Sequence, residues 1–356
     1  MKRNPVLSGI DRIADVDGLL KNKRVGLMTN PTGIDHSLKS TIDIVNERYR
    51  LTALFAVEHG IRGDAQAGAK VDNCVDEQTG VTVYSTYGAN SRFNQEMLDA
   101  FDVLVFDIQD VGARFYTYLY SLSYAMEACH RALKPIVVLD RVNPLGGKKL
   151  CGTVLDTRFS SFVGNYELPT QYALTIGEYA RYVKDYLRLD GLELTVVPLT
   201  GWRREWLLDD TDLPWVAPSP NCQNLDAALC YIGTCIFEGT NVSEGRGTTM
   251  PFQVVGAPFI NGAALEARMA AHELPGLHFR RTSFCPTFSK HQGQMCHGVQ
   301  MHVTDRDICD CFAGGLWLLE EIRAMYADRL EYLRWGDNTP HSLDKLLGTD
   351  ASARAA

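Results

Sequence analysis

The sequence predicts an α/β protein whose larger, first domain is a Rossmann-like, doubly wound parallel sheet, followed by a smaller α+β domain. Its main apolar stretches are rich in Val, Leu and Ile and are separated by helix-length segments. This pattern is typical of a parallel sheet that is covered by helices on both faces. The stretches are RVGLMTN (24–30), LTALFAVEHG (51–60), VLVFDIQD (103–110), PIVVLDR (135–141) and LELTVVPL (192–199).

Helical periodicity supports the alternation of strands and helices. Apolar residues recur at helical spacing over residues 37–49, 116–133 and 175–189. Residues 201–223 are rich in Trp and Pro and lack a sustained period, so we place the domain boundary near Asn224. We expect a catalytic domain over residues 1–224 and a smaller domain over 225–356 that closes an active-site cleft.

Composition excludes several classes of protein. The chain has 356 residues, 46% of them hydrophobic and 22% charged, which fits a globular protein of two domains. The net charge of -8 argues against nucleic acid and anionic membrane as partners. No apolar run approaches the roughly 20 residues that span a bilayer. The ten Cys residues and a first segment without an apolar signal region lead us to expect a cytoplasmic protein with reduced thiols.

We expect no cofactor. A dinucleotide-binding fold needs a G-x-G-x-x-G turn after its first strand, whereas TNPTGID here supplies a single Gly33. The GGKK segment at Gly146 lacks the spacing and the final Ser or Thr of a phosphate-binding loop.

Polar residues at the carboxyl ends of the strands are the candidate active site, because ligands of open parallel sheets bind there. Glu58 ends an apolar stretch and precedes His59, and Asn30 ends the first stretch. Burial of a carboxyl group favours its protonated form, which a general acid needs. The alternative is that Glu58 caps a helix or pairs with Arg62.

The next two strand ends supply further candidates. In DIQDVGARFYTY, two acids could serve as base and stabiliser, Arg114 could bind a carboxylate, and two tyrosines could stack on a sugar. The alternative has Asp110 capping the helix and pairing with Arg114. DRVNPLGG adds two residues that could instead form a mutual ion pair. The candidates are Asp107, Asp110, Arg114, Tyr116, Tyr118, Asp140 and Arg141.

The loop FEGTNVSEGRGTTMPF is dense in Gly, Thr, Asn and Glu, which favours a ligand-binding role over a simple tight turn. Farther on, His297 and His302 have opposite parity along a strand, so we expect no metal among His291, Cys296, His297 and His302. The remaining substrate-binding candidates are Asn221, just before the boundary, and Glu238, Asn241, Ser243, Glu244 and Arg246 after it.

Several long segments resemble the exo-β-N-acetylmuramidase family, which was long known only as a domain of unknown function. They are AVEHGIRGD, DIQDVGARFYTY, DRVNPLGG, CHGVQMHVTDRD and the run from PSPNCQN to VVGAPF, and the similarity extends from about Arg24 to Thr349. The resemblance implies a Rossmann-like domain joined to a smaller domain with the active site between them. It also implies removal of terminal β-linked N-acetylmuramic acid from the non-reducing end of peptidoglycan fragments during cell-wall turnover, with Glu58 as the catalytic acid.

The resemblance leaves the mechanism open. Asp107, Asp110 and Glu244 are eligible as the second carboxyl group, and a separation of about 5 Å or of about 6.5–9.5 Å would distinguish retention from inversion. Attack by the 2-acetamido group and elimination of the lactyl group are further alternatives. For the lactyl carboxylate we expect Arg114 first and Arg246 second. The oligomeric state and stem-peptide tolerance are left open.

Two rival functions remain at this stage. A metal-assisted hydrolase would use Asp107, Asp110 and His59, and a muropeptide-binding protein would bind without turnover. The chain also departs from many relatives. Those relatives are exported, whereas this sequence shows no signal peptide, so we expect either action on imported fragments or a different natural precursor. They also continue beyond the DKLLGTDASARAA end, which would affect packing of the second domain if the end is a truncation.

Overall fold

The structure is a computed structural model that describes residues 4–62, 73–88, 92–336 and 341–350. The chain divides by its internal contacts into two compact units. The boundary predicted near Asn224 lies close to the start of the last segment of the second unit. Sequence patterning does not indicate the two earlier segments that group with that unit. The first unit comprises Met1–Gly112, Tyr116–Lys148 and Ala173–Pro220, and the second comprises Ala113–Phe115, Lys149–Tyr172 and Asn221–Ala356.

The first unit is built on a sheet of seven strands in the order β3-β4-β2-β1-β5-β6-β7, counted over the described residues. All neighbouring strands are parallel except β3, which runs antiparallel to β4. The central strand β1 pairs Leu27 with Leu54 of β2 and with Val105 of β5. The strands are β1 (Arg24–Thr29), β2 (Arg50–Ala56), β3 (Cys74–Val75), β4 (Thr82–Ser85), β5 (Val103–Asp107), β6 (Ile136–Leu139) and β7 (Leu194–Val197).

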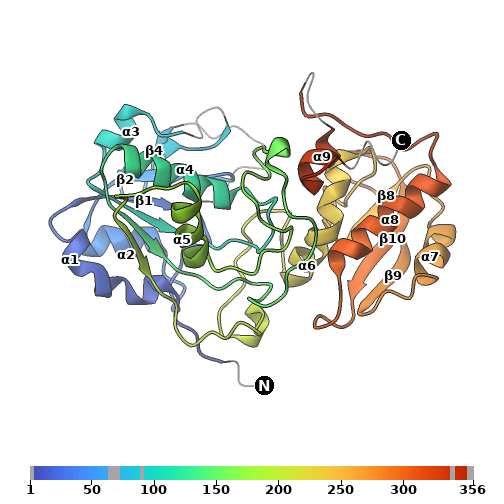
Figure 1. The fold of residues 1–356 in the computed structure, drawn as a ribbon, viewed down its shortest axis with the longest axis horizontal. Helices are drawn as coiled ribbons and strands as arrows, with labels where there is room; N and C mark the ends of the chain where they lie inside the picture. The colour runs from blue at the N-terminus through green and yellow to red at the C-terminus, as the bar shows by residue number, and fades with distance from the viewer. Residues whose placement is uncertain (1–3, 63–72, 89–91, 337–340, 351–356) are drawn as a thin grey trace. The chain divides into compact units, whose positions relative to one another are not determined.

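Helices cover both faces of this sheet, which confirms the doubly wound fold (Figure 1). On one face Ile10, Leu20 and Val45 join the core formed by alternate strand residues. On the other face Gly177 of α5 lies against Val196, whose neighbour Val197 belongs to the first core. The first face carries η1 (Gly9–Val16), α1 (Asp17–Leu20) and α2 (Thr41–Arg48), while α3 (Gln95–Asp99), α4 (Tyr118–Arg131), α5 (Ile176–Tyr186) and η4 (Leu208–Asp210) complete the unit.

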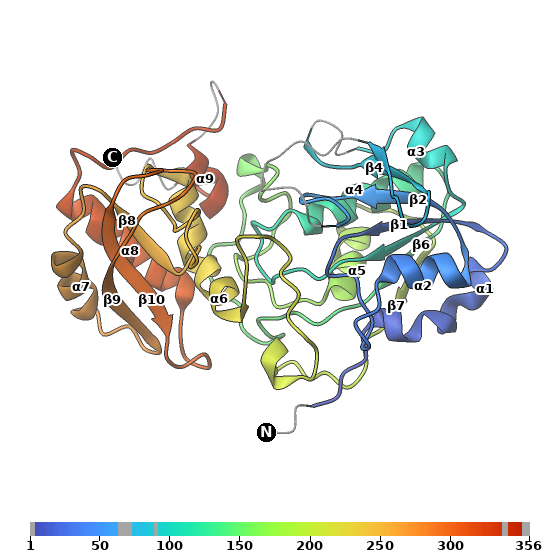
Figure 2. The same ribbon diagram turned by 180° about the vertical axis from the view of Figure 1, so that it is seen from behind.

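The second unit is a smaller α+β structure with a three-stranded antiparallel sheet in the order β8-β10-β9 (Figure 2). Helices α6 and α8 approach closely where Gly233 faces Gly315, because a Cβ atom at Gly315 would lie 2.1 Å from the Gly233 carbonyl oxygen. The elements are η3 (Thr157–Phe159), α6 (Leu225–Thr234), η5 (Cys235–Gly239), β8 (Val254–Ala257), α7 (Gly262–Ala270), β9 (Leu277–Phe284), β10 (Cys296–Val303), α8 (Cys311–Met325) and α9 (Ser342–Leu347).

Side-chain caps explain where several helices begin. Ser40, Asn224 and Asp310 each accept a hydrogen bond from a main-chain N–H in the first turn of α2, α6 and α8. Thr175 and Glu178 form a capping box at the start of α5. A search of the described residues found no helix with the length and apolar character needed to cross a membrane.

Candidate active site

Glu58 lies just beyond the carboxyl end of β2, and two hydroxyl groups contact its carboxyl group. The Tyr87 hydroxyl donates to Oε1 at 2.9 Å, and the Thr117 hydroxyl donates to Oε2 at 2.8 Å. Arg62, the ion-pair partner considered for Glu58, instead pairs with Asp76 at 2.9 Å. Sequence reasoning missed Tyr87 and Thr117, because only the fold brings β4 and the start of α4 next to β2.

His59 follows Glu58 in a tight turn. Its φ of 74° lies in the left-handed region, which a residue with a side chain adopts at a cost, and Gly60 follows with a φ of 76°. His59 is only 4% exposed, whereas Glu58 is partly accessible. The turn therefore reverses the chain immediately after β2 and leaves the Glu58 carboxyl group at the strand end.

Tyr118 is the buried centre of the polar residues near Glu58. It interacts with Asn30, Tyr116, Glu58 and Asp110, and burial, with a smaller contribution from the charge of Glu58, raises the pKa of its hydroxyl well above the usual range. The phenol is therefore neutral at physiological pH, and it donates to the Pro218 carbonyl oxygen.

The tyrosines were expected to stack on a sugar. The rings of Tyr116 and Tyr118 meet edge to face with centroids 4.9 Å apart. Tyr118 is completely buried, which leaves its ring no exposed face for a sugar, and Tyr116 is 9% exposed.

Asp107 and Arg141 form a buried, bidentate ion pair. Arg141 donates from Nε to Oδ1 of Asp107 at 2.6 Å and from Nη2 to Oδ2 at 2.7 Å, and the Thr41 hydroxyl also donates to Oδ2. The alternative of a mutual ion pair between Asp140 and Arg141 is therefore wrong. Arg141 also borders a space of about 30 Å³, which has room for water and none for a sugar ring.

Asp140 binds the amino end of α5. Its Oδ1 accepts from the Gly177 N–H at 2.8 Å, and its Oδ2 accepts from the Thr175 hydroxyl at 3.2 Å. Burial raises the pKa of Asp140 to about 6, although these hydrogen bonds act in the opposite direction. These contacts fit a residue that stabilises the strand–helix connection.

Asp110 and Arg114 were considered as a helix cap with its ion-pair partner. Asp110 instead accepts from the Gly112 N–H at 2.8 Å, and the N-cap of α4 is Thr117. The Arg114 side chain is completely buried, and its guanidinium donates to the main-chain oxygens of Thr153, Leu168 and Leu346. Arg114 belongs to the second unit.

The polar loop of the second unit forms an ion-pair cluster. Arg246 contacts Glu238 at 2.6 Å and Glu244 at 3.2 Å, and Lys290 contacts Glu244 at 2.7 Å. Burial by itself would raise the pKa of Glu244, but Lys290 and Arg246 lower it overall. Glu244 therefore stays ionised, and Lys290, which sequence reasoning missed, supplies part of its counter-charge.

The remaining candidates in this loop contact the main chain. Asn241 donates to the Arg329 carbonyl oxygen at 2.8 Å and accepts from the Glu331 N–H at 3.0 Å. Ser243 accepts from the Gly245 N–H at 3.2 Å. Asn221 lies outside this loop, before α6, and is 4% exposed. The hydrogen bonds of Asn241 and Ser243 therefore hold the loop in its conformation.

The His and Cys residues considered as metal ligands have other contacts. His291 Nε2 lies 2.7 Å from the Asn241 carbonyl oxygen, and His297 Nδ1 lies 2.8 Å from the Ser283 hydroxyl. In the ranges that the structure describes, no three His, Cys, Asp or Glu side chains are grouped so that they could hold a metal ion.

Comparison with known proteins places the chain in a family. It matches the N-terminal model of exo-beta-N-acetylmuramidase NamZ over residues 25–226 and the C-terminal model over residues 229–355. It is 49% identical over 350 residues to the peptidoglycan beta-N-acetylmuramidase NamZ of Bacillus subtilis strain 168, covering 98% of this chain and 83% of that protein.

Two crystal structures of DUF1343 family proteins from Bacteroides fragilis share the fold. The first has a TM-score of 0.91 at 35% identity and covers 99% of this chain and 91% of its own. The second has a TM-score of 0.75 at 30% identity and covers 98% and 90%. With both family models matched in order along the sequence, the chain belongs to the exo-β-N-acetylmuramidase NamZ family.

Proposed function

We propose that this protein is an exo-acting glycoside hydrolase that releases terminal β-linked N-acetylmuramic acid from the non-reducing end of peptidoglycan fragments. The observation that carries this proposal is the 49% identity to a peptidoglycan beta-N-acetylmuramidase over nearly the whole chain. The polar strand ends around Glu58 support it, because glycoside hydrolysis uses carboxyl groups on either side of the scissile bond.

Glu58 is our general acid, which protonates the leaving glycosidic oxygen. Its carboxyl group is contacted by the neutral hydroxyls of Tyr87 and Thr117. A hydroxyl both donates and accepts, so each contact can persist whether the carboxyl group holds or has released its proton. That property suits a group that must give up a proton in one step and regain it in another.

Asp110 is our choice for the second carboxyl group of the first unit. Both oxygens of Asp107 are bound by Arg141 or Thr41, whereas Asp110 takes part in the Tyr118 cluster that also includes Glu58. We assign Asp107 and Arg141 to positioning the strand ends. We assign Arg114 to the packing of the second unit, where its buried guanidinium donates to main-chain oxygens.

The test is hydrolysis of the nitrophenyl β-glycoside of N-acetylmuramic acid by the wild type, by Glu58→Gln and by the matched control Glu47→Gln. Glu47 is a surface residue of α2 that pairs with Lys39. We expect Glu58→Gln to lower kcat by about 10²–10⁴-fold, as loss of a general acid does, while Glu47→Gln keeps full activity. The N-acetylglucosamine glycoside should not be turned over.

Two outcomes would contradict the proposal in different ways. Loss of activity with a chelator would favour the metal-assisted hydrolase. Saturable binding of muropeptide by a folded wild type, without any turnover, would favour the binding protein.

A further inference from the structure

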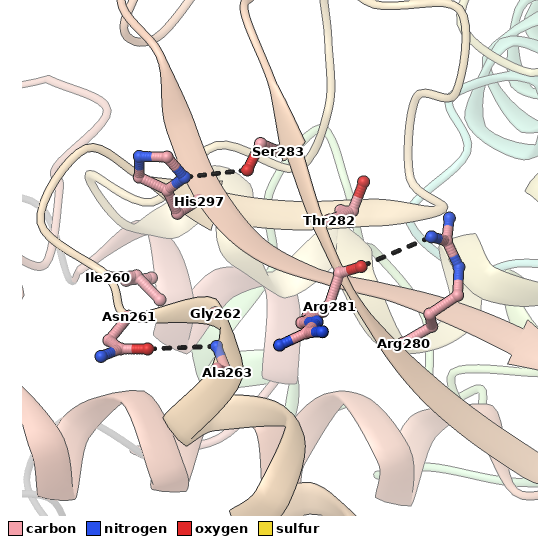
Figure 3. A pocket seen from close by; sticks show the side chains of 9 residues that line it. All are labelled: Ile260, Asn261, Gly262, Ala263, Arg280, Arg281, Thr282, Ser283 and His297. Carbon is pink, nitrogen blue, oxygen red and sulfur yellow. Dashed lines mark hydrogen bonds between the residues drawn. The ribbon is translucent and has the colours of Figure 1, made fainter.

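The second unit contains a hollow of about 700 Å³ that no step of the proposed reaction uses. It lies between the edge strand β9, the adjoining start of β10 and the start of α7 (Figure 3). Its polar lining comes from Asn261, Arg280, Arg281, Thr282, Ser283 and His297. A volume of this size is within the range of about 300–1,000 Å³ typical of small-molecule sites.

The lining of this hollow is basic, although the chain as a whole is acidic. The net charge of the protein is -8, yet the residues that line the hollow include Arg280, Arg281 and His297 and no carboxylate. The amino end of α7 adds a partial positive charge. A hollow with this charge favours an anionic ligand.

Arg281 is the cation best placed to meet a ligand. Its side chain is 69% exposed, and its ion pair with Glu266 is long, at 3.9 Å. In Figure 3 it points toward Asn261 and Ala263, while Arg280 points away from them and donates to Gln300 at 2.7 Å. Arg281 can therefore turn its planar fork of N–H groups to a ligand without breaking a short ion pair.

His297 also lines the hollow. Its Nδ1 lies 2.8 Å from the Ser283 hydroxyl, and the two residues are directly paired across β9 and β10. This contact fixes the orientation of the ring, so that Nε2 is the nitrogen through which His297 can meet a ligand. The hollow is therefore lined by an Arg fork and an imidazole that come from neighbouring strands.

We propose that this hollow is a second ligand site, which binds a carboxylate carried by a peptidoglycan fragment through Arg281 and His297. The identity of the ligand rests on the proposed function, while the site itself rests on the hollow and its charge. A carboxylate matches the guanidinium fork in two parallel hydrogen bonds, and the volume accommodates the sugar or peptide to which it is attached.

The carboxylate has two possible sources in such a fragment. N-acetylmuramic acid presents its lactyl carboxylate, whereas in N-acetylmuramyl dipeptide that group is an amide and the peptide supplies the carboxylates. N-acetylglucosamine lacks a carboxylate and is the negative probe. If N-acetylmuramic acid slows hydrogen exchange at the hollow, the ligand group is the lactyl carboxylate. If only the dipeptide slows it, the ligand group is a carboxylate of the stem peptide.

The experiment is hydrogen exchange of the intact protein with each probe, joined to calorimetric titration. We expect a carboxylate probe to slow exchange in β9 and in the first turn of α7. Arg281→Ala/His297→Ala should abolish this protection and weaken the corresponding binding by about tenfold or more, since two hydrogen bonds to a charged group are lost. Arg281→Lys keeps the charge and loses the planar fork, so its affinity for the probe should lie between those of the wild type and the double variant.

Arg323→Ala is the matched control, because Arg323 is a partly exposed Arg of the second unit and pairs with Glu320 outside the hollow. It should bind like the wild type. Equal protection by N-acetylglucosamine, protection by inorganic phosphate alone, or protection that persists in the double variant would overturn the proposal. Turnover of the nitrophenyl glycoside by the same samples tests the proposed function separately, and the double variant should retain it.

Discussion

The two hydroxyl contacts of Glu58 allow its role to be tested without removing its carboxyl group. Thr117 is the N-cap of α4, but its side chain makes no capping hydrogen bond and its hydroxyl donates to Glu58 instead. We expect Thr117→Val to lower kcat/KM about tenfold, because the carboxyl group loses one positioned donor.

Thr117→Ser is the control for that measurement, since it restores the hydroxyl and should restore kcat/KM. Tyr87→Phe removes the other donor and should act in the same direction. An unchanged kcat/KM in Thr117→Val would show that its hydroxyl does not act through Glu58.

The Asp107–Arg141 pair permits a second test at the residue scale. Both side chains are buried, and removing one partner leaves an uncompensated charge. We expect Arg141→Met to lower the free energy of unfolding by about 3–5 kcal/mol, measured by urea denaturation. If Arg141→Met instead keeps its stability and loses substrate affinity, Arg141 binds substrate as the sequence first suggested.

Among the secondary-structure elements, the connection between β6 and α5 should make stability depend on pH. The folded protein holds the Asp140 proton up to a pKa of about 6, whereas the usual value for Asp is 3.8. Unfolding therefore releases this proton between these values, and the free energy of unfolding falls as pH rises through that window.

Asp140→Asn removes that dependence while keeping an oxygen that can accept from the Gly177 N–H. Relative to the variant, we expect the wild type to lose up to roughly 3 kcal/mol of stability between about pH 4 and pH 7, at 1.36 kcal/mol per pKa unit. The measurement is urea unfolding of both proteins at several pH values. Parallel stability curves would contradict the prediction.

The sequence predicted secondary-structure elements correctly where an apolar or helical pattern was long. It missed an element whose formation depends on tertiary contacts. The strands β1, β2, β5, β6 and β7 lie where apolar runs predicted them, and α2, α4 and α5 lie within the predicted helices. The edge strand β9 was missed, because its burial alternates only over residues 277–280 and the exposed Arg281 interrupts the pattern. Strand β9 is stabilised by pairing with β10 and by packing against α7, and its local sequence alone does not show either contact.

For the whole molecule, the interleaved units predict how fragments behave. In the second unit, Asp156 N–H donates to the Gly348 carbonyl oxygen at 2.9 Å, and Arg114 donates to the Leu346 carbonyl oxygen at 2.8 Å. A fragment of residues 221–356 lacks both donors. We expect it to be unfolded or strongly destabilised by circular dichroism and amide exchange, relative to the intact chain.

The informative control for that fragment is the addition of residues 113–172 as a separate polypeptide, which should restore protection in α9 if those contacts matter. A fragment of residues 221–356 that folds cooperatively by itself would show that the earlier segments are dispensable.

The fold class, the polar strand ends and the family follow from the sequence, because they depend on local periodicity and on long specific motifs. Which polar groups meet is known only from the three-dimensional structure. There Arg141 pairs with Asp107, Tyr87 and Thr117 donate to Glu58, and Arg114 is buried among main-chain oxygens. Hydrogen bonds and ion pairs depend on distances of a few ångströms between residues far apart in the chain, and sequence spacing does not encode those distances.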